Sequence, residues 1–274
     1  MFKRLLVPVD LSTQSFLMVE VASRMAHYGV EEVMVYSMTP DPSRKERMLE
    51  LMDSKLREAG MDHRLLLETG TDAARAIVKA SEVNEASMIA MAASGKGRVR
   101  EFIVGSTSLG VIRRTSVPVL LDKFPLEADE DPDGYCERCP PLLDSVLVSL
   151  DLSKVSRHMM PFVQKIIDAG AKRVTLFHVV QPSRYGMDDD HRFQEVRRRM
   201  EAYRKRLHPG DCSIDLHIHF GTTTYNILEA AREVEATVIV LGTTGKSYLR
   251  GATLGSTSEE VVKASTRPVL LIPA

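Results

Sequence analysis

The stretch that decides the fold is TVIVLGTTGKSYLRGATLGSTS, residues 237–258, because its pattern recurs as SMIAMAASGKGRVREFIVGSTS at residues 87–108. Both copies run from an apolar segment into a Gly-Lys loop and end in Gly-Ser-Thr-Ser at the same spacing. An internal repeat determines the whole architecture, so the rest of the chain must be interpreted as two copies of one unit.

The duplication extends to both ends of each copy. KRLLVPVDLS (3–12) matches DSVLVSLDLS (144–153), which aligns Asp10 with Asp151, and SVPVLL (116–121) matches RPVLLI (267–272). The segment between the copies is rich in proline and acidic residues and has no apolar period, which is typical of a linker. We therefore predict a first domain at 1–122, a linker at 123–143 and a second domain at 144–274.

Each copy alternates short apolar strands with helices. In the first copy we expect strands at 2–9, 32–38, 62–68, 88–92 and 117–122, and helices at 12–28 (with Ser12 as N-cap), 43–59, 71–84 and 106–115. Such alternation indicates βαβ units and a parallel sheet covered on both faces. The strand orders 2-1-3-4-5 and 3-2-1-4-5 both fit the pattern. Our predicted fold is α/β, with two tandem copies of a five-stranded, doubly wound, Rossmann-like parallel sheet in the order 3-2-1-4-5.

Composition and charge limit the function classes. The 274 residues are 44% hydrophobic and 27% charged with a net charge of −1, which is typical of a soluble globular protein and gives no electrostatic reason to expect nucleic acid or a membrane as partner. No apolar run approaches the roughly 20 residues of a membrane span. The N-terminal MFKRLLVPVDLS predicts a first strand rather than a signal peptide. The three cysteines argue against a disulfide scaffold, so we expect a cytoplasmic protein.

The glycine loop of the second copy has the chemistry of an anion site. Its spacing is Gly242-x2-Gly245-x9-Gly255-Ser256. Glycines let the backbone N–H groups approach a phosphate, and hydroxyl residues at a helix start add further donors. Turn glycines and an ordinary N-cap serine are the alternative, and the recurrence in both copies favours binding. A Walker A motif is rejected because Val240 occupies the position where that motif requires its first glycine.

The loop and an apolar first strand that ends in Asp together resemble the universal stress protein family in its tandem-domain form. The resemblance implies an adenine nucleotide alpha hydrolase-like fold and a regulatory, non-enzymatic stress-response protein that binds ATP, ADP or AMP, with or without Mg²⁺. It places these second-copy residues around the nucleotide: Asp151, Val179, Leu241, Gly242, Gly245, Gly255, Ser256, Thr257 and Ser258. The matching first-copy residues are Asp10, Met38, Met91, Ala92, Gly95, Gly105, Ser106, Thr107 and Ser108.

The first copy departs from the motif at Ala92, where the family has glycine. A methyl group there crowds the ribose or phosphates, so we expect the second copy to be the better site and the first to be weak, selective for a smaller nucleotide or empty. We expect Gly242→Val to weaken binding and leave the fold intact. Basic loop residues either neutralise phosphate or are simply solvated: Lys246, Arg250, Lys96, Arg98 and Arg100.

Other motifs carry weaker hypotheses. Cys136-x2-Cys139 is half of a zinc site, but no second pair lies nearby, so a reduced linker is favoured over a metal shared by two chains. His217 and His219 share one strand face, which favours an exposed polar face over a metal, and Cys212 is interpreted as structural. His178 ends the second strand of its copy near the expected base pocket. No catalytic residue and no metal site are predicted.

The resemblance also implies partners. Single-domain members of the family dimerise through their last strand, so we expect the two copies to pair through 117–121 and 268–272, with a homodimer of whole chains as a further expectation. A protein partner is expected but not identified. Two alternatives remain, a slow nucleotide phosphohydrolase and a ligand-free protein-interaction scaffold.

Overall fold

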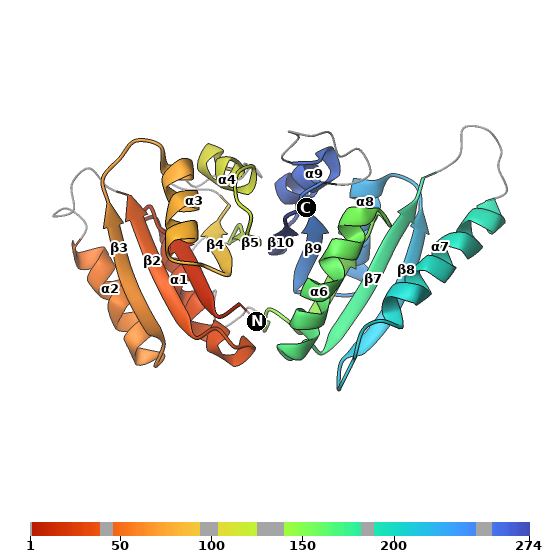
Figure 1. Cartoon of the computed structure of the whole chain (residues 1–274), viewed down its shortest axis with the longest axis horizontal. Coiled ribbons are helices and arrows are strands. Elements are labelled where there is room, and N and C mark those ends of the chain that lie inside the picture. The colour runs from red at the N-terminus through yellow and green to blue at the C-terminus, as the bar shows by residue number, and fades with distance from the viewer. Residues whose placement is uncertain (1, 39–45, 94–103, 125–139, 182–188, 245–253) are drawn as a thin grey trace. The chain divides into compact units, whose positions relative to one another are not determined.

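The structure, a computed structural model, describes residues 2–38, 46–93, 104–124, 140–181, 189–244 and 254–274. The chain divides into two compact units, Met1–Cys139 and Pro140–Ala274 (Figure 1). Each unit is a parallel sheet with helices on both faces, so the predicted α/β class is confirmed.

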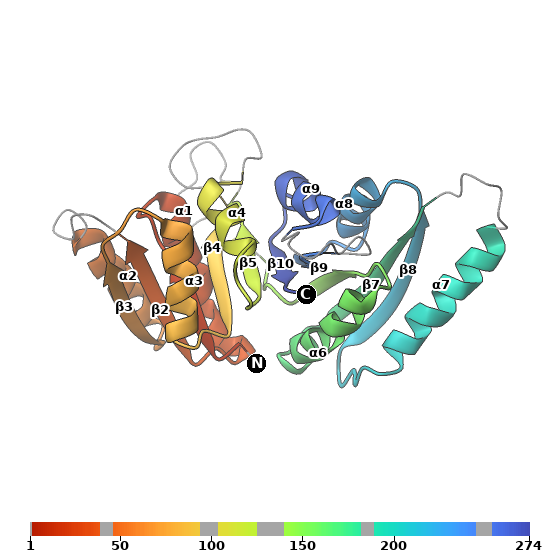
Figure 2. The same ribbon diagram turned by 45° about the horizontal axis from the view of Figure 1, so that its top comes forward.

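In the first unit the strands are β1 (Arg4–Pro8), β2 (Glu32–Met38), β3 (Asp62–Glu68), β4 (Met88–Ala92) and β5 (Val119–Asp122). They pair in parallel in the order β3-β2-β1-β4-β5, which is the predicted 3-2-1-4-5 order. The helices are α1 (Thr13–Ser23), α2 (Glu46–Glu58), α3 (Ala73–Val83) and α4 (Ser106–Ile112). Figure 2 shows α3 and α4 on the face of the sheet opposite to α1 and α2.

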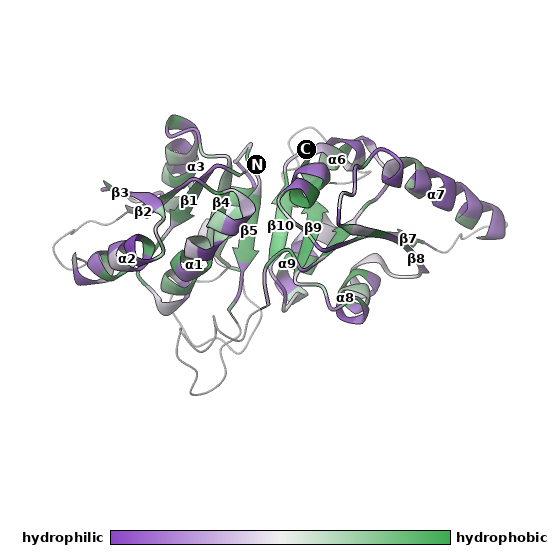
Figure 3. Cartoon of the chain, turned by 90° about the horizontal axis from the view of Figure 1, so that it is seen from below, coloured by the Kyte–Doolittle hydropathy of each residue, from purple (hydrophilic) through white to green (hydrophobic). Residues whose placement is uncertain are grey.

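The second unit repeats this arrangement. Its strands are β6 (Ser145–Ser149), β7 (Arg173–Val180), β8 (Ser213–Phe220), β9 (Val238–Gly242) and β10 (Val269–Ile272). They pair in parallel in the order β8-β7-β6-β9-β10. The helices are α6 (Lys154–Asp168), α7 (Asp189–Arg204), α8 (Thr223–Glu233) and α9 (Ser256–Ala264). In Figure 3, α6 and α7 cover one face and α8 and α9 the other.

The central strands form the core of each unit. Leu5, Leu6 and Val7 of β1 are 0% exposed, as are residues 146–148 of β6. These strands are covered on both faces, so successive residues are apolar rather than alternating. The contrast is plain in Figure 3, where the central strands are hydrophobic and the outward sides of the helices are hydrophilic.

The structure corrects some element bounds. The helix expected at 12–28 is α1 followed by a 3₁₀ turn at Arg24–Tyr28, where the last turn tightens before Gly29 adopts a φ of 83°. Helix α4 ends at Ile112 rather than Thr115. Strand β5 begins at Val119, because the preceding Pro118 has no N–H for the ladder and contributes only its carbonyl, to Ile89. The predicted N-cap Ser12 is confirmed, since its hydroxyl accepts from the Ser15 amide at 3.2 Å.

The end of α8 gives a stability prediction. Glu235 follows the C-cap residue Val234 and has a φ of 49°, in the left-handed region that favours glycine. We expect Glu235→Gly to raise the free energy of unfolding by about 0.5–1 kcal/mol, because it removes the Cβ strain of this conformation. Chemical denaturation measures the change. Glu235→Ala is the control: it removes the same charge but keeps the Cβ, so an equal gain in both variants would contradict the backbone explanation.

Among the residues that the structure describes, no helix has the length and apolarity needed to cross a bilayer.

Candidate functional site

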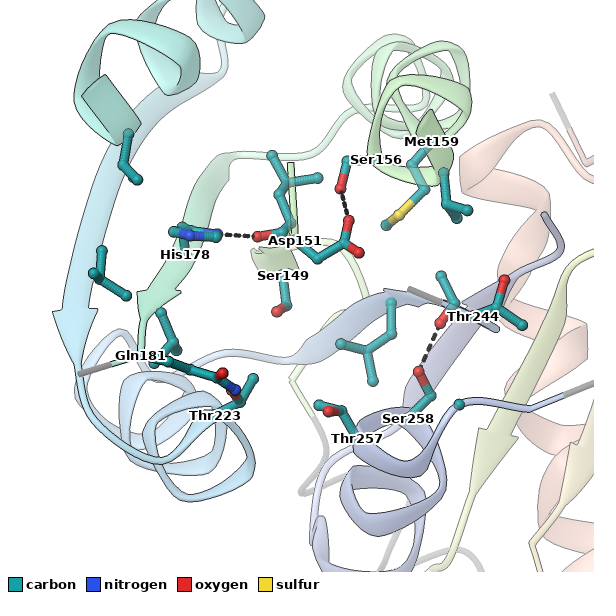
Figure 4. Close-up of a pocket in the computed structure, with 18 of the residues that line it drawn as sticks. Ser149, Asp151, Ser156, Met159, His178, Gln181, Thr223, Thr244, Thr257 and Ser258 are labelled. Atoms are coloured by element: carbon teal, nitrogen blue, oxygen red, sulfur yellow. Dashed lines mark hydrogen bonds between the residues drawn. The ribbon is translucent and has the colours of Figure 1, made fainter. Parts of the chain in front are cut away.

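The second unit contains a cavity of about 500 Å³ at the carboxyl ends of β6, β7 and β9 (Figure 4). The chain leaves β6 for α6 on one face of the sheet and leaves β9 for α9 on the other, so the cavity lies at the topological switch point. Doubly wound sheets bind their ligands at this point, and the volume is within the range of small-molecule sites.

The structure brings most of the predicted second-copy residues to this cavity. These line it: Asp151, Val179, Leu241, Gly242, Gly255, Ser256, Thr257 and Ser258. Gly245 lies outside the described residues, as do the loop cations Lys246 and Arg250. The geometry therefore places residues from three separate parts of the chain around one space.

Asp151 is held by the chain that follows it. Its Oδ1 accepts hydrogen bonds from the Ser153 amide at 2.9 Å and from the Ser156 hydroxyl at 2.6 Å. Its Oδ2 is buried and has no hydrogen-bond partner among the described residues. Leu152 adopts a φ of 61°, a strained conformation for a residue with a Cβ, and this kink lets the loop fold back under the carboxylate. Oδ1 thus positions Asp151, and Oδ2 is a buried acceptor without a partner among the described residues, on a side chain that lines the cavity.

The N-terminus of α9 forms the opposite wall. Gly255 is the N-cap, and Ser256 and Thr257 begin the helix, where the first-turn N–H groups have no acceptor within the helix. Figure 4 shows Thr257 and Ser258 across the cavity from Asp151. The Ser258 hydroxyl donates to the Gly242 carbonyl at 2.7 Å. A hydroxyl has a single proton, so the Ser258 hydroxyl is used in holding α9 against β9. The donors that this wall can offer a ligand are therefore the backbone N–H groups and the hydroxyls of Ser256 and Thr257.

Gly242 is required by packing. A Cβ at this position would lie 2.8 Å from Val155 Cγ1 of α6 and 3.2 Å from the Thr244 carbonyl oxygen. Real Cβ atoms essentially never approach other atoms at 2.8 Å, so a side chain here would force Val155 or its surroundings to shift. The expectation that Gly242→Val leaves the fold intact is therefore corrected: the substitution strains the core as well as the cavity.

We expect Gly242→Ala to lower the free energy of unfolding by about 1–3 kcal/mol, the usual cost of overpacking. Val155→Ala removes the atom that the new methyl group meets, so the double variant Gly242→Ala/Val155→Ala should recover part of the loss. Thermal or chemical denaturation of the three variants gives the coupling between the two positions. Strictly additive losses would show that the contact with Val155 does not explain the glycine.

The cavity wall also includes His178, which the sequence placed near the base pocket, and several residues that the sequence analysis missed. Thr244 is 8% exposed, and its hydroxyl has no hydrogen-bond partner in the described parts of the chain. His178 is 5% exposed, and its Nδ1 donates to the Leu150 carbonyl at 2.5 Å, which fixes the tautomer. Gln181 donates to the Thr223 hydroxyl at 3.1 Å. The helix α7 adds Arg192, Glu195, Val196 and Arg199.

Only part of this set had a sequence signal. Thr244 lies inside the glycine loop and could have been included. Residues 192, 195, 196 and 199 follow helical spacing, so they share one face of α7. Helix α7 packs against β7 and β8, and nothing local to that helix shows that this face lines the cavity.

The first unit differs at the matching positions. Ala92 ends β4, and Met38, which matches Val179, extends towards Gly70, where a Cβ would meet its sulfur at 3.0 Å. Asp10 repeats one contact of Asp151, since its Oδ1 accepts from the Ser12 amide at 3.0 Å. Met91 is buried at the end of β4. Gly105 and residues 106–108 form the N-cap and first turn of α4, and Gly95 and the basic residues 96, 98 and 100 lie outside the described residues.

The histidine and cysteine hypotheses have mixed outcomes. The structure finds no group of three or more metal-ligating side chains among the residues it describes. His217 and His219 stack at 6.5 Å on β8, and His219 also packs edge-on against Phe177 at 5.1 Å, so this face is partly buried rather than fully exposed. Cys212 is a buried free thiol whose pKa is raised by burial. Cys136 and Cys139 lie outside the described residues.

Fold and site together define a class: a tandem pair of doubly wound α/β units with a ligand-sized cavity at the switch point of the second. The sequence model described as the universal stress protein family matches residues 1–123 and again residues 143–273. The chain therefore belongs to the universal stress protein family.

Individual relatives agree with this assignment. A solved universal stress protein from Archaeoglobus fulgidus has 26% sequence identity and a TM-score of 0.76, over 100% of this chain and 99% of that one. Universal stress protein MJ0577 of Methanocaldococcus jannaschii is 30% identical over 79 residues, which are 29% of this chain and 49% of the relative. Universal stress protein Slr1230 of Synechocystis is 40% identical over 65 residues, 24% of this chain and 22% of that protein. The chain thus spans about half of the first curated relative and about a fifth of the second.

Proposed function

We propose that the second unit binds an adenine nucleotide (ATP, ADP or AMP) and that the chain acts as a regulatory nucleotide-binding protein of the stress response. The observation that carries the proposal is the buried Oδ2 of Asp151, an acceptor without a partner among the described residues, on the wall of a cavity that also contains the N-terminus of α9. A ribose hydroxyl is the donor that such an acceptor needs.

The opposite wall suits phosphate. The helix N-terminus carries a partial positive charge and unsatisfied N–H groups, and both favour an anion. Ser256 and Thr257 add hydroxyl donors beside the backbone at Gly255. A carboxylate acceptor at one end and helix N–H donors at the other match a polar, anionic ligand with hydroxyl groups, which is the chemistry of a nucleotide.

Apolar side chains supply a surface for the base. Val155, Met159, Val179 and Leu241 line the cavity. Purine rings bury well against such atoms because their faces are weakly hydrated. The resemblance to the family favours adenine as the base.

Titration of nucleotide-stripped protein with ATP, ADP and AMP, in the presence of Mg²⁺ and of EDTA, tests the proposal. We expect one nucleotide per chain, because Ala92 replaces the motif glycine in the first unit. Acid release from freshly purified protein, followed by chromatography, identifies any bound nucleotide. A folded chain that binds none of the three would favour the ligand-free scaffold, and steady phosphate release that Asp151→Ala abolishes would favour the phosphohydrolase.

The assembly remains a separate proposal. We keep the prediction that 117–121 and 268–272 pair the two copies and that whole chains form homodimers. Light scattering of the purified chain tests for the homodimer directly. A monomer at working concentrations would contradict the homodimer.

A further inference from the structure

Helix α7 brings cationic side chains to the cavity. These residues are far along the chain from the glycine loop. Arg192 and Arg199 both line it, one on each side of Glu195 on the same helix face. Under the proposed function, the glycine loop and the N-terminus of α9 bind the 5′-phosphates of the nucleotide. A second set of cations in the same cavity therefore requires its own explanation.

Arg199 is the better defined of the two arginines. Its guanidinium donates a hydrogen bond to the Leu152 carbonyl, the residue directly after Asp151. Among the described residues, no carboxylate lies within ion-pairing distance of Arg199. A guanidinium has five N–H donors, so a single carbonyl leaves most of them available. The contact holds the cation beside the loop that carries the ribose acceptor.

The environment of Tyr203 supports this placement. Burial raises the pKa of the Tyr203 hydroxyl, the nearby positive charges of Arg199 and Arg157 lower it, and the negative charge of Asp151 raises it. Arg199 and Asp151 thus act on a common neighbour. If Asp151 accepts from a ribose hydroxyl, Arg199 lies on the ribose side of the ligand rather than on the side of the 5′-phosphates.

A carboxylate and an arginine have opposite chemical meanings at a ribose. In dinucleotide sites an acidic residue accepts from a free ribose hydroxyl, whereas a nearby arginine accommodates a phosphate on that ring. Arginine suits such a phosphate because its donors match the oxygens in pairs. We propose that the ligand preferred by this cavity is an adenine nucleotide that carries a second phosphate on its ribose ring, with Arg199 as the specificity residue.

The other charges at this wall determine how strongly the cavity prefers a nucleotide with a second phosphate. Asp151 and Glu195 oppose a second phosphate, and Arg199 and Arg192 attract it. A phosphate on one ribose hydroxyl leaves the other free to donate to Asp151 Oδ2. Charge-assisted hydrogen bonds are the stronger kind, so we expect a net preference of at least about 10-fold.

The inference rests on the proposed function, and its test separates the two. Titration calorimetry compares AMP with adenosine 2′,5′-bisphosphate and adenosine 3′,5′-bisphosphate on the full chain. We expect one of the two bisphosphates to bind about 10-fold or more tightly than AMP, and the preferred isomer shows which hydroxyl carries the phosphate. AMP binding with no preference beyond threefold overturns this inference and leaves the proposed function standing. Absence of binding by all three nucleotides overturns this inference, and the titration with ATP and ADP then decides the proposed function.

Matched variants assign the effect to a side chain. Arg199→Gln should reduce the preference for the bisphosphate over AMP, the ratio of the two affinities measured on the same variant, to below about threefold. Arg198→Gln is the control, because Arg198 is the adjacent arginine on α7 and does not line this cavity. A preference that survives in Arg199→Gln, or that falls equally in Arg198→Gln, overturns the role of Arg199. If Arg199→Gln lowers the melting temperature, Arg192→Gln gives a second variant on the same wall. The comparison of AMP with the two bisphosphates on the unaltered chain needs no variant.

Discussion

Replacing Gly255 with Asp is expected to lower the affinity of the chain for ATP at least 100-fold while leaving its melting temperature unchanged or higher. Gly255 has φ −73° and ψ 149°, an extended conformation that any residue adopts, and it is the N-cap of α9. Aspartate is a preferred N-cap and interacts favourably with the helix dipole. The helix therefore tolerates the substitution.

The same carboxylate would stand where the proposed phosphate binds. At an effective dielectric constant of about 20, two negative charges ~4 Å apart repel by about 4 kcal/mol. A 100-fold loss of affinity corresponds to about 2.7 kcal/mol. This is less than the expected repulsion, so the repulsion is large enough to cause the loss. Calorimetric titration with ATP gives the affinity, and a thermal melt without ligand gives the stability.

Gly255→Ser is the matched control for this substitution. Serine is an equally good N-cap without a charge, so the affinity for ATP should stay within about threefold of the original. If Gly255→Asp binds ATP as well as the unaltered chain does, the phosphates do not lie at the start of α9. The assignment of this wall would then be wrong, whatever the cavity binds.

Asp151→Ala is expected to lower ATP affinity about 10- to 100-fold, the range for losing a hydrogen bond to a charged group. It should also lower the free energy of unfolding by about 1 kcal/mol, because Oδ1 accepts from the Ser153 amide and from the Ser156 hydroxyl. The two effects have different origins within one side chain. Titration and denaturation have to be measured together to separate them.

Two controls divide the effects of Asp151→Ala. Ser156→Ala removes one contact of Oδ1 and leaves Oδ2 in place, so it should lower stability and keep ATP affinity within about threefold. Asp10→Ala makes the equivalent change in the first unit and should leave ATP affinity unchanged if that unit does not bind. An equal loss of affinity in Asp10→Ala and Asp151→Ala would show two equivalent sites and contradict the predicted stoichiometry.

The cavity shows which parts of the site could be predicted from the sequence. The two opposite walls, one with Asp151 and one with the start of α9, were predicted, because the repeat and the family motif mark those positions on the chain. The roles within the motif were not resolved. Ser258 belongs to the motif, yet its hydroxyl holds the Gly242 carbonyl, and Gly242 itself is constrained by Val155. A motif records which residues occur together but not which atom each of them contacts.

The amino-acid sequence by itself determined the duplication, the alternation of strands and helices, and the position of the glycine loops, because periodicity and repetition are properties of neighbours along the chain. The tertiary structure alone decided that α7 turns Arg192 and Arg199 towards the cavity and that Asp151 keeps one carboxylate oxygen without a partner among the described residues. These features arise where α7 packs beside the loop after β6. They join residues far apart in the chain, and no local pattern encodes which of those residues meet.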